Sequence, residues 1–371
     1  MPAIHVTKPA LAPLDAFARK LESAWESGVL THNGPLVREL EARLCDYLAL
    51  PRLAAVTNGT IALQLAIRAL GLRGEIITTP FSWIATVSAI VYEGCRPVFV
   101  DIDPETLNID PAQIEARITR HTSAILPVHV FSNPCATGEI GEIAARHRLK
   151  VIYDGAHAFN VRQGGQPLAL AGDVTALSFH ATKLFNTGEG GACVTADPEL
   201  DARIRRLRFF GHDDTRNIVD DGTNGKMTEI HAALGLVNLE FAAAVERKRR
   251  SDYTHYLACL GSAPALRFQR IDPEACNHSY LPVIFPDEDS LLAAEQALLA
   301  ESVVARRYFY PALNTLDRLF PYQPFPVAES ISRRILCLPL YFELGTADIE
   351  RISGIVVDSL ARHSSAKRAT P

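Results

Sequence analysis

The stretch that decides the fold is Ser178-Phe-His-Ala-Thr-Lys183-Leu-Phe-Asn-Thr-Gly-Glu-Gly-Gly191. It overlaps the end of an apolar run, residues 174–179, which is typical of a buried strand. The glycines at its end lack side chains and so let the backbone pass close to a bound group. Lys183 therefore follows the carboxyl end of a strand, where sheet proteins of the α/β class bind ligands.

A lysine in a loop is most often an ordinary surface residue. Here the context favours a functional role, because the chain has only seven lysines and the others lie in terminal, helical or polar surroundings. Only Lys226, in the stretch Gly222-Thr-Asn-Gly-Lys-Met-Thr-Glu-Ile-His-Ala-Ala233, competes with Lys183.

Short apolar runs and helical patterns alternate around this stretch, from residue 52 to about residue 195. This alternation predicts an α/β fold, with a mainly parallel sheet and helices on both faces. The predicted strands are residues 75–80, 97–102, 124–130 and 150–154, and the predicted helices are residues 60–70, 111–118, 140–147 and 200–208.

The rest of the chain predicts a second, smaller domain. A polar loop over residues 212–225 precedes a helix over 228–250, and the C-terminal part mixes a strand (280–285) with helices (290–299 and 346–360). We therefore predict a large domain with the N-terminal segment over residues 1–245 and a small α+β domain over 246–371.

The composition is that of an ordinary globular protein, with 48% hydrophobic and 21% charged residues. The net charge of −5 gives no electrostatic reason to expect nucleic acid or a membrane surface as a partner. The seven cysteines are scattered, so they indicate reduced thiols rather than a metal knuckle or redox pair. With no signal-peptide pattern and no long apolar run, the expectation is a cytoplasmic protein without a metal site.

Four chemical groups that pyridoxal phosphate needs lie near predicted strand ends. Lys183 is the amine, and Asp154, which ends the run Val-Ile-Tyr-Asp, is a carboxylate for the pyridine nitrogen. Trp83 is a flat ring to cover the cofactor. The hydroxyls and free amides for its phosphate are at Asn58-Gly-Thr60, which opens a helix, and at Ser178. Taken singly, each of these residues also has a purely structural interpretation. Asp154 and Asn58-Gly-Thr60 could equally well cap helices, and a tryptophan more often belongs to the hydrophobic core than to a cofactor site.

These same blocks resemble the sugar-nucleotide aminotransferases of the DegT/DnrJ/StrS family, over nearly the whole chain. The resemblance implies the aspartate aminotransferase fold with its seven-stranded sheet, pyridoxal phosphate as cofactor, and a homodimer with shared active sites. It also implies the site residues: Lys183 as the lysine that joins the cofactor, Asp154 at the pyridine nitrogen, His157 beside the ring hydroxyl, Trp83 stacked on the ring, Gly59, Thr60 and Ser178 at the phosphate, and Asn224 reaching the phosphate from the neighbouring subunit.

Two positions depart from the family pattern, Ser132 and Gly155, where glycine and alanine are common. The combination of Asn133-Pro-Cys135, Phe179-His-Ala-Thr-Lys-Leu-Phe-Asn186 and Phe209-Phe-Gly-His-Asp-Asp214 looks most like the branch that makes 4-amino-4,6-dideoxyglucose (viosamine) on thymidine diphosphate. For that branch we expect L-glutamate as the amino donor and a place in lipopolysaccharide or O-antigen biosynthesis.

Three alternatives remain at this point. One is an aminotransferase for a 3-keto sugar nucleotide. Another is a related sugar dehydratase, which has histidine in place of the lysine, and the presence of Lys183 argues against it. The third is a non-catalytic regulator of the same fold. The sequence leaves the nucleotide and the sugar stereochemistry open, and loops near Asn33, residues 210–214 and residues 307–310 are the candidates for the sugar pocket.

Overall fold

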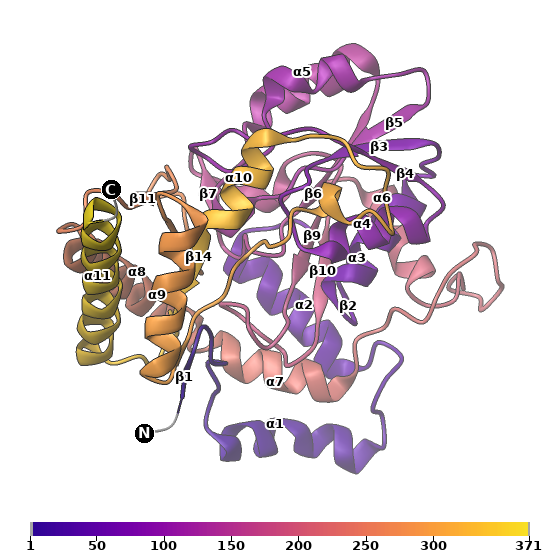
Figure 1. The fold of residues 1–371 in the computed structure, drawn as a ribbon. Helices are drawn as coiled ribbons and strands as arrows, with labels where there is room; N and C mark the ends of the chain where they lie inside the picture. The colour runs from indigo at the N-terminus through magenta and orange to yellow at the C-terminus, as the bar shows by residue number, and fades with distance from the viewer. Residues whose placement is uncertain (1–2, 370–371) are drawn as a thin grey trace.

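The computed structural model describes residues 3–369, which form a seven-stranded sheet covered by helices and a smaller C-terminal part (Figure 1). The strand order is β2-β10-β9-β6-β5-β3-β4, and only β10 runs antiparallel to its neighbours. The predicted mainly parallel sheet with helices on both faces is therefore confirmed. The strands are β2 (Leu53–Val56), β3 (Glu75–Thr78), β4 (Arg96–Phe99), β5 (Thr122–Ile125), β6 (Lys150–Asp154), β9 (Val174–Ser178) and β10 (Gly191–Val194).

Side chains along each strand alternate between two apolar layers, as the two-residue period of a strand requires. Leu53 and Ala55 of β2 face one layer, and Ala54 and Val56 face the other. The first face is covered by α2 (Pro35–Leu48), α5 (Thr137–His147) and α7 (Glu229–Leu239), with α1 (Leu14–Ser27) outside α7 (Figure 1). The second face is covered by α3 (Gly59–Ala69), α4 (Ile84–Tyr92) and α6 (Pro198–Leu207).

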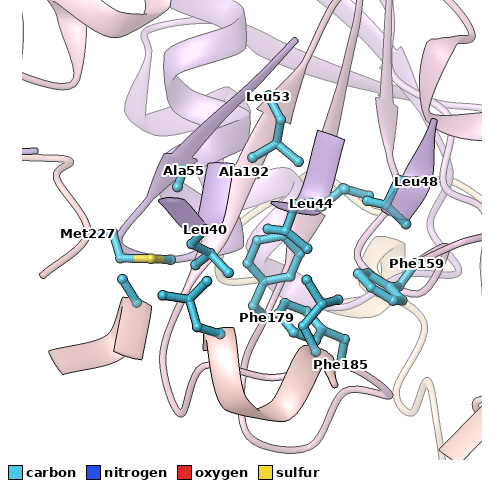
Figure 2. Close-up of a cluster of buried hydrophobic side chains, with 14 of the residues drawn as sticks. Leu40, Leu44, Leu48, Leu53, Ala55, Phe159, Phe179, Phe185, Ala192 and Met227 are labelled. Carbon is cyan, nitrogen blue, oxygen red and sulfur yellow. The ribbon is translucent and has the colours of Figure 1, made fainter. Parts of the chain in front are cut away.

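The residues around Lys183 are part of the first layer. Phe179, Leu184 and Phe185 are buried with Leu40 and Leu44 of α2, as Figure 2 shows for the phenylalanines and the α2 leucines. Phe185 stacks on Phe159 at a centroid distance of 4.8 Å. Burial on both sides of Lys183 holds its backbone in place, because each buried aromatic side chain contributes a few kcal/mol to packing.

The C-terminal part is built on the antiparallel sheet β11-β12-β14 and on long helices. Its predicted boundary at residues 245/246 falls inside one helix, α8. The parallel pair of β1 with β13 joins the N-terminal segment to this part of the protein. The elements are β1 (Ile4–His5), α8 (Ala242–Leu260), β11 (Arg267–Phe268), β12 (Leu281–Ile284), α9 (Glu288–Ala300), β13 (Val303–Val304), α10 (Pro326–Arg334), β14 (Ile335–Leu338) and α11 (Thr346–Ala369).

A mixed apolar cluster joins the C-terminal part to the carboxyl edge of the large sheet. Phe81 and Phe131 from the large domain pack with Phe309, at centroid distances of 5.4 and 5.6 Å, and Tyr280 belongs to the same cluster. This cluster brings residues of the C-terminal part close to the end of strand β9. Within residues 3–369, no helix is long and apolar enough to cross a membrane.

Three predicted elements differ from the structure. The single helix over 228–250 is wrong, because the chain turns at Glu240–Phe241 between α7 and α8. The helix over 111–118 is two short 3₁₀ turns, η1 (Pro111–Gln113) and η2 (Glu115–Arg117), and the strand over 124–130 ends early at Ile125. The remaining short elements are the hairpin β7 (Arg162–Gln163) and β8 (Gln166–Pro167), and the 3₁₀ turns η3 (Val130–Ser132), η4 (Leu168–Leu170) and η5 (Leu313–Thr315).

Gly155, one of the two departures from the family pattern, is explained by its neighbour Thr175. A Cβ at position 155 would lie 2.7 Å from Cγ2 of Thr175, closer than van der Waals contact allows. We predict that Gly155→Ala destabilises the protein by about 1–3 kcal/mol, the usual cost of overpacking. Thr175→Ser, which removes that methyl group, should recover part of this loss in the double variant, since the Ala176 carbonyl oxygen and Leu177 Cδ2 would still lie 3.2 Å from the new Cβ. Urea unfolding of the wild type, both single variants and the double variant measures the coupling, and additive effects would contradict the explanation.

Candidate active site

A cavity of about 430 Å³ lies at the carboxyl edge of the large sheet, where β6 and β9 end. It brings together the predicted residues Gly59, Thr60, Trp83, Asp154, His157, Ser178 and Lys183, but does not include Asn224 of the same chain. It is also lined by Asn58, Leu63, Ala85, His180, Thr182, Glu189, Tyr280, Arg306, Tyr308 and Phe309.

Lys183 extends into this cavity from the loop after β9. Its Nζ donates a hydrogen bond to the hydroxyl of Tyr280 at 3.3 Å. Burial disfavours the ammonium form and lowers the pKa of Lys183 from 10.5 to about 8, although Asp154 opposes this shift. A substantial fraction of the amine is therefore neutral near physiological pH, as a nucleophile or proton carrier requires.

Asp154 ends strand β6 and is buried at the floor of the cavity. Its Oδ2 accepts a hydrogen bond from Thr86 Oγ1 at 2.7 Å, and its Oδ1 accepts one from the Ala156 amide at 3.1 Å. Thr86 is in turn hydrogen-bonded to Ser82 at 2.7 Å. Within residues 3–369, no basic side chain lies within ion-pair distance of Asp154, and burial raises its pKa. The carboxylate thus has no cation in direct contact, although the charge of Lys183 in the same cavity opposes the rise of its pKa.

His157 is held in one tautomer by the backbone. Its Nδ1 accepts a hydrogen bond from the Phe131 amide at 3.2 Å, so the ring proton is on Nε2. Burial and the charge of Lys183 hold the pKa of His157 well below 6.5. His157 is therefore a neutral hydrogen-bond donor through Nε2.

The loop that supplies the Phe131 amide includes Ser132, the second departure from the family pattern. Ser132 has a left-handed φ of 71°, a conformation that suits glycine and costs other residues about 1–2 kcal/mol. Its hydroxyl is buried and hydrogen-bonded to Cys276 Sγ at 2.8 Å. Such a bond contributes about 1 kcal/mol and offsets much of that strain.

The N-terminus of α3 forms an anion cradle with Ser178. The Asn58 side chain caps the helix by accepting from the Ile61 amide at 2.9 Å, and the amides of Gly59 and Thr60 precede the first intrahelical bond. A Cβ at Gly59 would lie 3.0 Å from Cβ of Ser178, so glycine lets the helix start approach Ser178 this closely without a shift of either segment. Free amides, a helix dipole and two hydroxyls suit a phosphate.

Trp83 lies at the mouth of the cavity, with 51% of its surface exposed. It caps α4 and lies edge-on to Tyr308, with ring centroids 6.4 Å apart. The indole is not a core residue, and a large exposed ring beside a cavity is available for a ligand.

Asn224 lies outside this cavity, so its predicted role at the phosphate of a neighbouring subunit stays a prediction. It is exposed, and its Oδ1 accepts a hydrogen bond from Lys226 Nζ. Lys226 is stacked over Phe210, with Nζ 4.3 Å from the ring centroid, and lines a separate hollow of about 610 Å³ that also includes Asn33.

Sequence reasoning missed Tyr280 and Arg306 as site residues. Both come from the C-terminal part of the chain, and the sequence places Tyr280 only at the start of an apolar strand. The loop near residues 307–310, a candidate for the sugar pocket, does reach the cavity through Tyr308 and Phe309. Of the other candidate loops, Asn33 and residues 212–214 line the separate hollow instead.

The residues present fit pyridoxal phosphate. The unpaired buried carboxylate of Asp154 matches a protonated pyridine nitrogen, since a buried charge is stable only when paired. Lys183 has the depressed pKa that a reactive amine needs, and the cradle at Gly59, Thr60 and Ser178 matches the phosphate.

Comparisons with known proteins show the family of the chain. Residues 14–357 match the sequence profile of the DegT/DnrJ/EryC1/StrS aminotransferase family. The dTDP-4-amino-4,6-dideoxy-D-glucose transaminase of Shigella dysenteriae is 42% identical over 359 residues, which cover 94% of this chain and 97% of that protein. The enzyme of the same name from Escherichia coli is 38% identical over 367 residues, covering 96% and 99%. Among solved structures, that of DesI in the presence of its TDP-sugar product superposes with a TM-score of 0.93 at 35% identity, covering 99% and 96% of the two chains.

Proposed function

The chain belongs to the DegT/DnrJ/EryC1/StrS aminotransferase family, and we propose that it transfers the amino group of L-glutamate to a dTDP-4-keto-6-deoxyglucose. The products are 2-oxoglutarate and dTDP-4-amino-4,6-dideoxyglucose. The observation that carries the proposal is that one cavity contains both the amine of Lys183, whose pKa is lowered, and the buried carboxylate of Asp154, which has no ion-pair partner. The two relatives from Shigella dysenteriae and Escherichia coli, each a dTDP-4-amino-4,6-dideoxy-D-glucose transaminase, support the choice of substrate.

Pyridoxal phosphate, when bound, supplies an electron-withdrawing ring that makes the carbon next to the donor's amino group acidic. Lys183 would take the proton from that carbon and deliver it to the cofactor, and its lowered pKa of about 8 keeps part of the amine neutral for this task. Tyr280 orients this amine through the 3.3 Å hydrogen bond.

The other residues bind and orient. Asp154 would keep a proton on the pyridine nitrogen, and Thr86 and the Ala156 amide hold both carboxylate oxygens in place for that contact. His157 would donate Nε2–H to the ring hydroxyl, and Trp83 would cover the ring. The cradle of Gly59, Thr60 and Ser178 would bind the phosphate.

The test is to incubate purified protein with pyridoxal phosphate, L-glutamate and a panel of keto-sugar nucleotides. The panel varies the keto position (C3 or C4), the sugar stereochemistry and the nucleotide. We expect 4-amino-4,6-dideoxyglucose on dTDP as the main product, identified by mass spectrometry and NMR. A preference for a 3-keto sugar would overturn the substrate assignment. Protein that stays colourless after incubation with cofactor would overturn the proposed transaminase function.

We further propose a homodimer in which Asn224 of one subunit completes the phosphate site of the other, and that the enzyme works in the cytoplasm. Asn224 is exposed and lies outside the Lys183 cavity of its own chain, which supports a role in trans. The scattered free cysteines support a reducing compartment.

The shared site predicts complementation between two inactive variants. Lys183→Ala and Asn224→Asp subunits, mixed after mild dissociation, should form heterodimers in which one site has both native residues. Random pairing restores about a quarter of wild-type activity, since half of the dimers are mixed and each has one intact site. Activity no higher than the mean of the two parent variants would contradict a shared site. A mixture of Lys183→Ala with Asp154→Asn subunits, whose residues share one chain, is the matched negative control.

A further inference from the structure

We propose that Arg306 binds a carboxylate of the amino donor at the mouth of the Lys183 cavity. The inference rests on the proposed transaminase function and adds to it a residue that recognises the donor.

The backbone of Arg306 is fixed, while its side chain is exposed. Its amide donates to the Cys337 carbonyl at 3.1 Å, and its carbonyl accepts from the Cys337 amide at 2.8 Å, just after strand β13. The guanidinium lies over the ring of Tyr308, with Cζ 4.5 Å from the centroid, and 5.4 Å from the centroid of Trp83. Two aromatic rings thus position a flat cation whose N–H groups remain available.

No acidic side chain within residues 3–369 forms an ion pair with Arg306. Its sequence neighbour behaves differently: Arg307 donates to Glu288 at 2.6 Å and to the Arg333 carbonyl at 2.7 Å. The guanidinium of Arg307 therefore binds other residues of the protein, whereas the charge of Arg306 remains available for a ligand.

The charged residues around the cavity indicate that the ligand of Arg306 is an anion. Lys183 and Arg306 are the basic residues among its described lining, and Asp154 and Glu189 are the acidic ones. Glu189 lies 3.6 Å from His180. When Lys183 is joined to the cofactor and the cradle holds a phosphate, Arg306 is the lysine or arginine among the described lining residues whose charge is left for another ligand. A donor such as L-glutamate brings two carboxylates, and a guanidinium matches a carboxylate with two parallel hydrogen bonds.

The experiment compares Arg306→Gln and Arg306→Lys with the wild-type holoenzyme. We expect Arg306→Gln to raise the KM for L-glutamate by about 10- to 100-fold, the usual loss for a charge-assisted hydrogen bond. Arg306→Lys keeps the positive charge but loses the two parallel N–H donors of the guanidinium, so its KM for L-glutamate should lie between the values of the wild type and Arg306→Gln. The KM for the keto-sugar nucleotide should stay within about twofold of the wild-type value, because each substrate enters in its own half-reaction. The matched control is Arg146→Gln, which changes an exposed arginine of α5 that is paired with Glu115.

A second measurement needs no turnover. Glutarate, a dicarboxylate without an amino group, should bind the wild-type holoenzyme in a calorimetric titration and lose about the same 10- to 100-fold in affinity in Arg306→Gln. Unchanged glutarate binding, or a KM increase for the sugar nucleotide instead of glutamate, would overturn the proposal. If no keto sugar reacts with the wild type, the proposed function fails, while the glutarate titration still decides the role of Arg306.

Discussion

Lys183→Ala is expected to lower transaminase turnover by at least about 10³-fold, since it removes both the amine that joins the cofactor and the base that moves the proton. The side chain extends into the cavity from a loop fixed by buried Phe179, Leu184 and Phe185, so the alanine variant should fold normally. Pyridoxal phosphate added to this variant should be lost on gel filtration much more readily than from the wild type, because only non-covalent contacts such as the phosphate cradle and Asp154 retain it. Absorbance of the cofactor after filtration measures this directly.

The matched control is Lys150→Ala, which removes an exposed lysine paired with Asp173 at 2.8 Å and far along strand β6 from the cavity edge. It should keep wild-type turnover and cofactor content. Residual activity in Lys183→Ala comparable to the Lys150→Ala control would reject Lys183 as the reactive lysine and return attention to Lys226.

Asp154→Asn is expected to lower turnover by about 10²- to 10⁴-fold while leaving the fold intact. An amide of the same shape can still accept from the Ala156 amide and donate to Thr86, but it cannot hold a positive charge on the pyridine nitrogen. The cofactor should also dissociate more readily. Steady-state turnover and the dissociation constant of pyridoxal phosphate are the two measurements.

The same substitution should stabilise the protein without cofactor. Burial raises the pKa of Asp154 above 3.8, so folding favours the protonated carboxyl. The stability that this group contributes is present below the unfolded pKa and is lost as pH rises through the higher folded pKa. At neutral pH, above the unfolded pKa, the wild type therefore bears a free-energy cost at this position that the asparagine lacks, and the Tm of the cofactor-free variant should be higher. A lower Tm, with unchanged cofactor affinity, would show that Asp154 is an ordinary structural acid.

The sequence predicted the parallel sheet and most of the cofactor residues because their signals are local. Gly59, Asp154, Ser178 and Lys183 each stand beside the strand or helix that positions them, so short patterns place them at one sheet edge. The order of these elements along the chain then brings them to the same cavity.

What the sequence did not predict depends on contacts between distant segments. Tyr280 and Arg306 reach the cavity only because the apolar cluster of Phe81, Phe131 and Phe309 joins the C-terminal part to the sheet. The turn between α7 and α8 has no proline or glycine at residues 240–241 to mark it. Periodicity continues through such a turn, which explains why one long helix was predicted.

The antiparallel strand β10 also sets the order in which the chain can fold. It pairs Gly191 with Val56 on one side and with Ser178 on the other, and so links segments well over a hundred residues apart. Such long-range pairing slows folding, because a large loop must close before its contacts form. During synthesis, Gly59 and Lys183 leave the ribosome before the strand that seats them side by side. The reactive centre can therefore assemble only after residues 191–194 have emerged, and a chain cut short before β10 would keep the key residues without the scaffold that unites them.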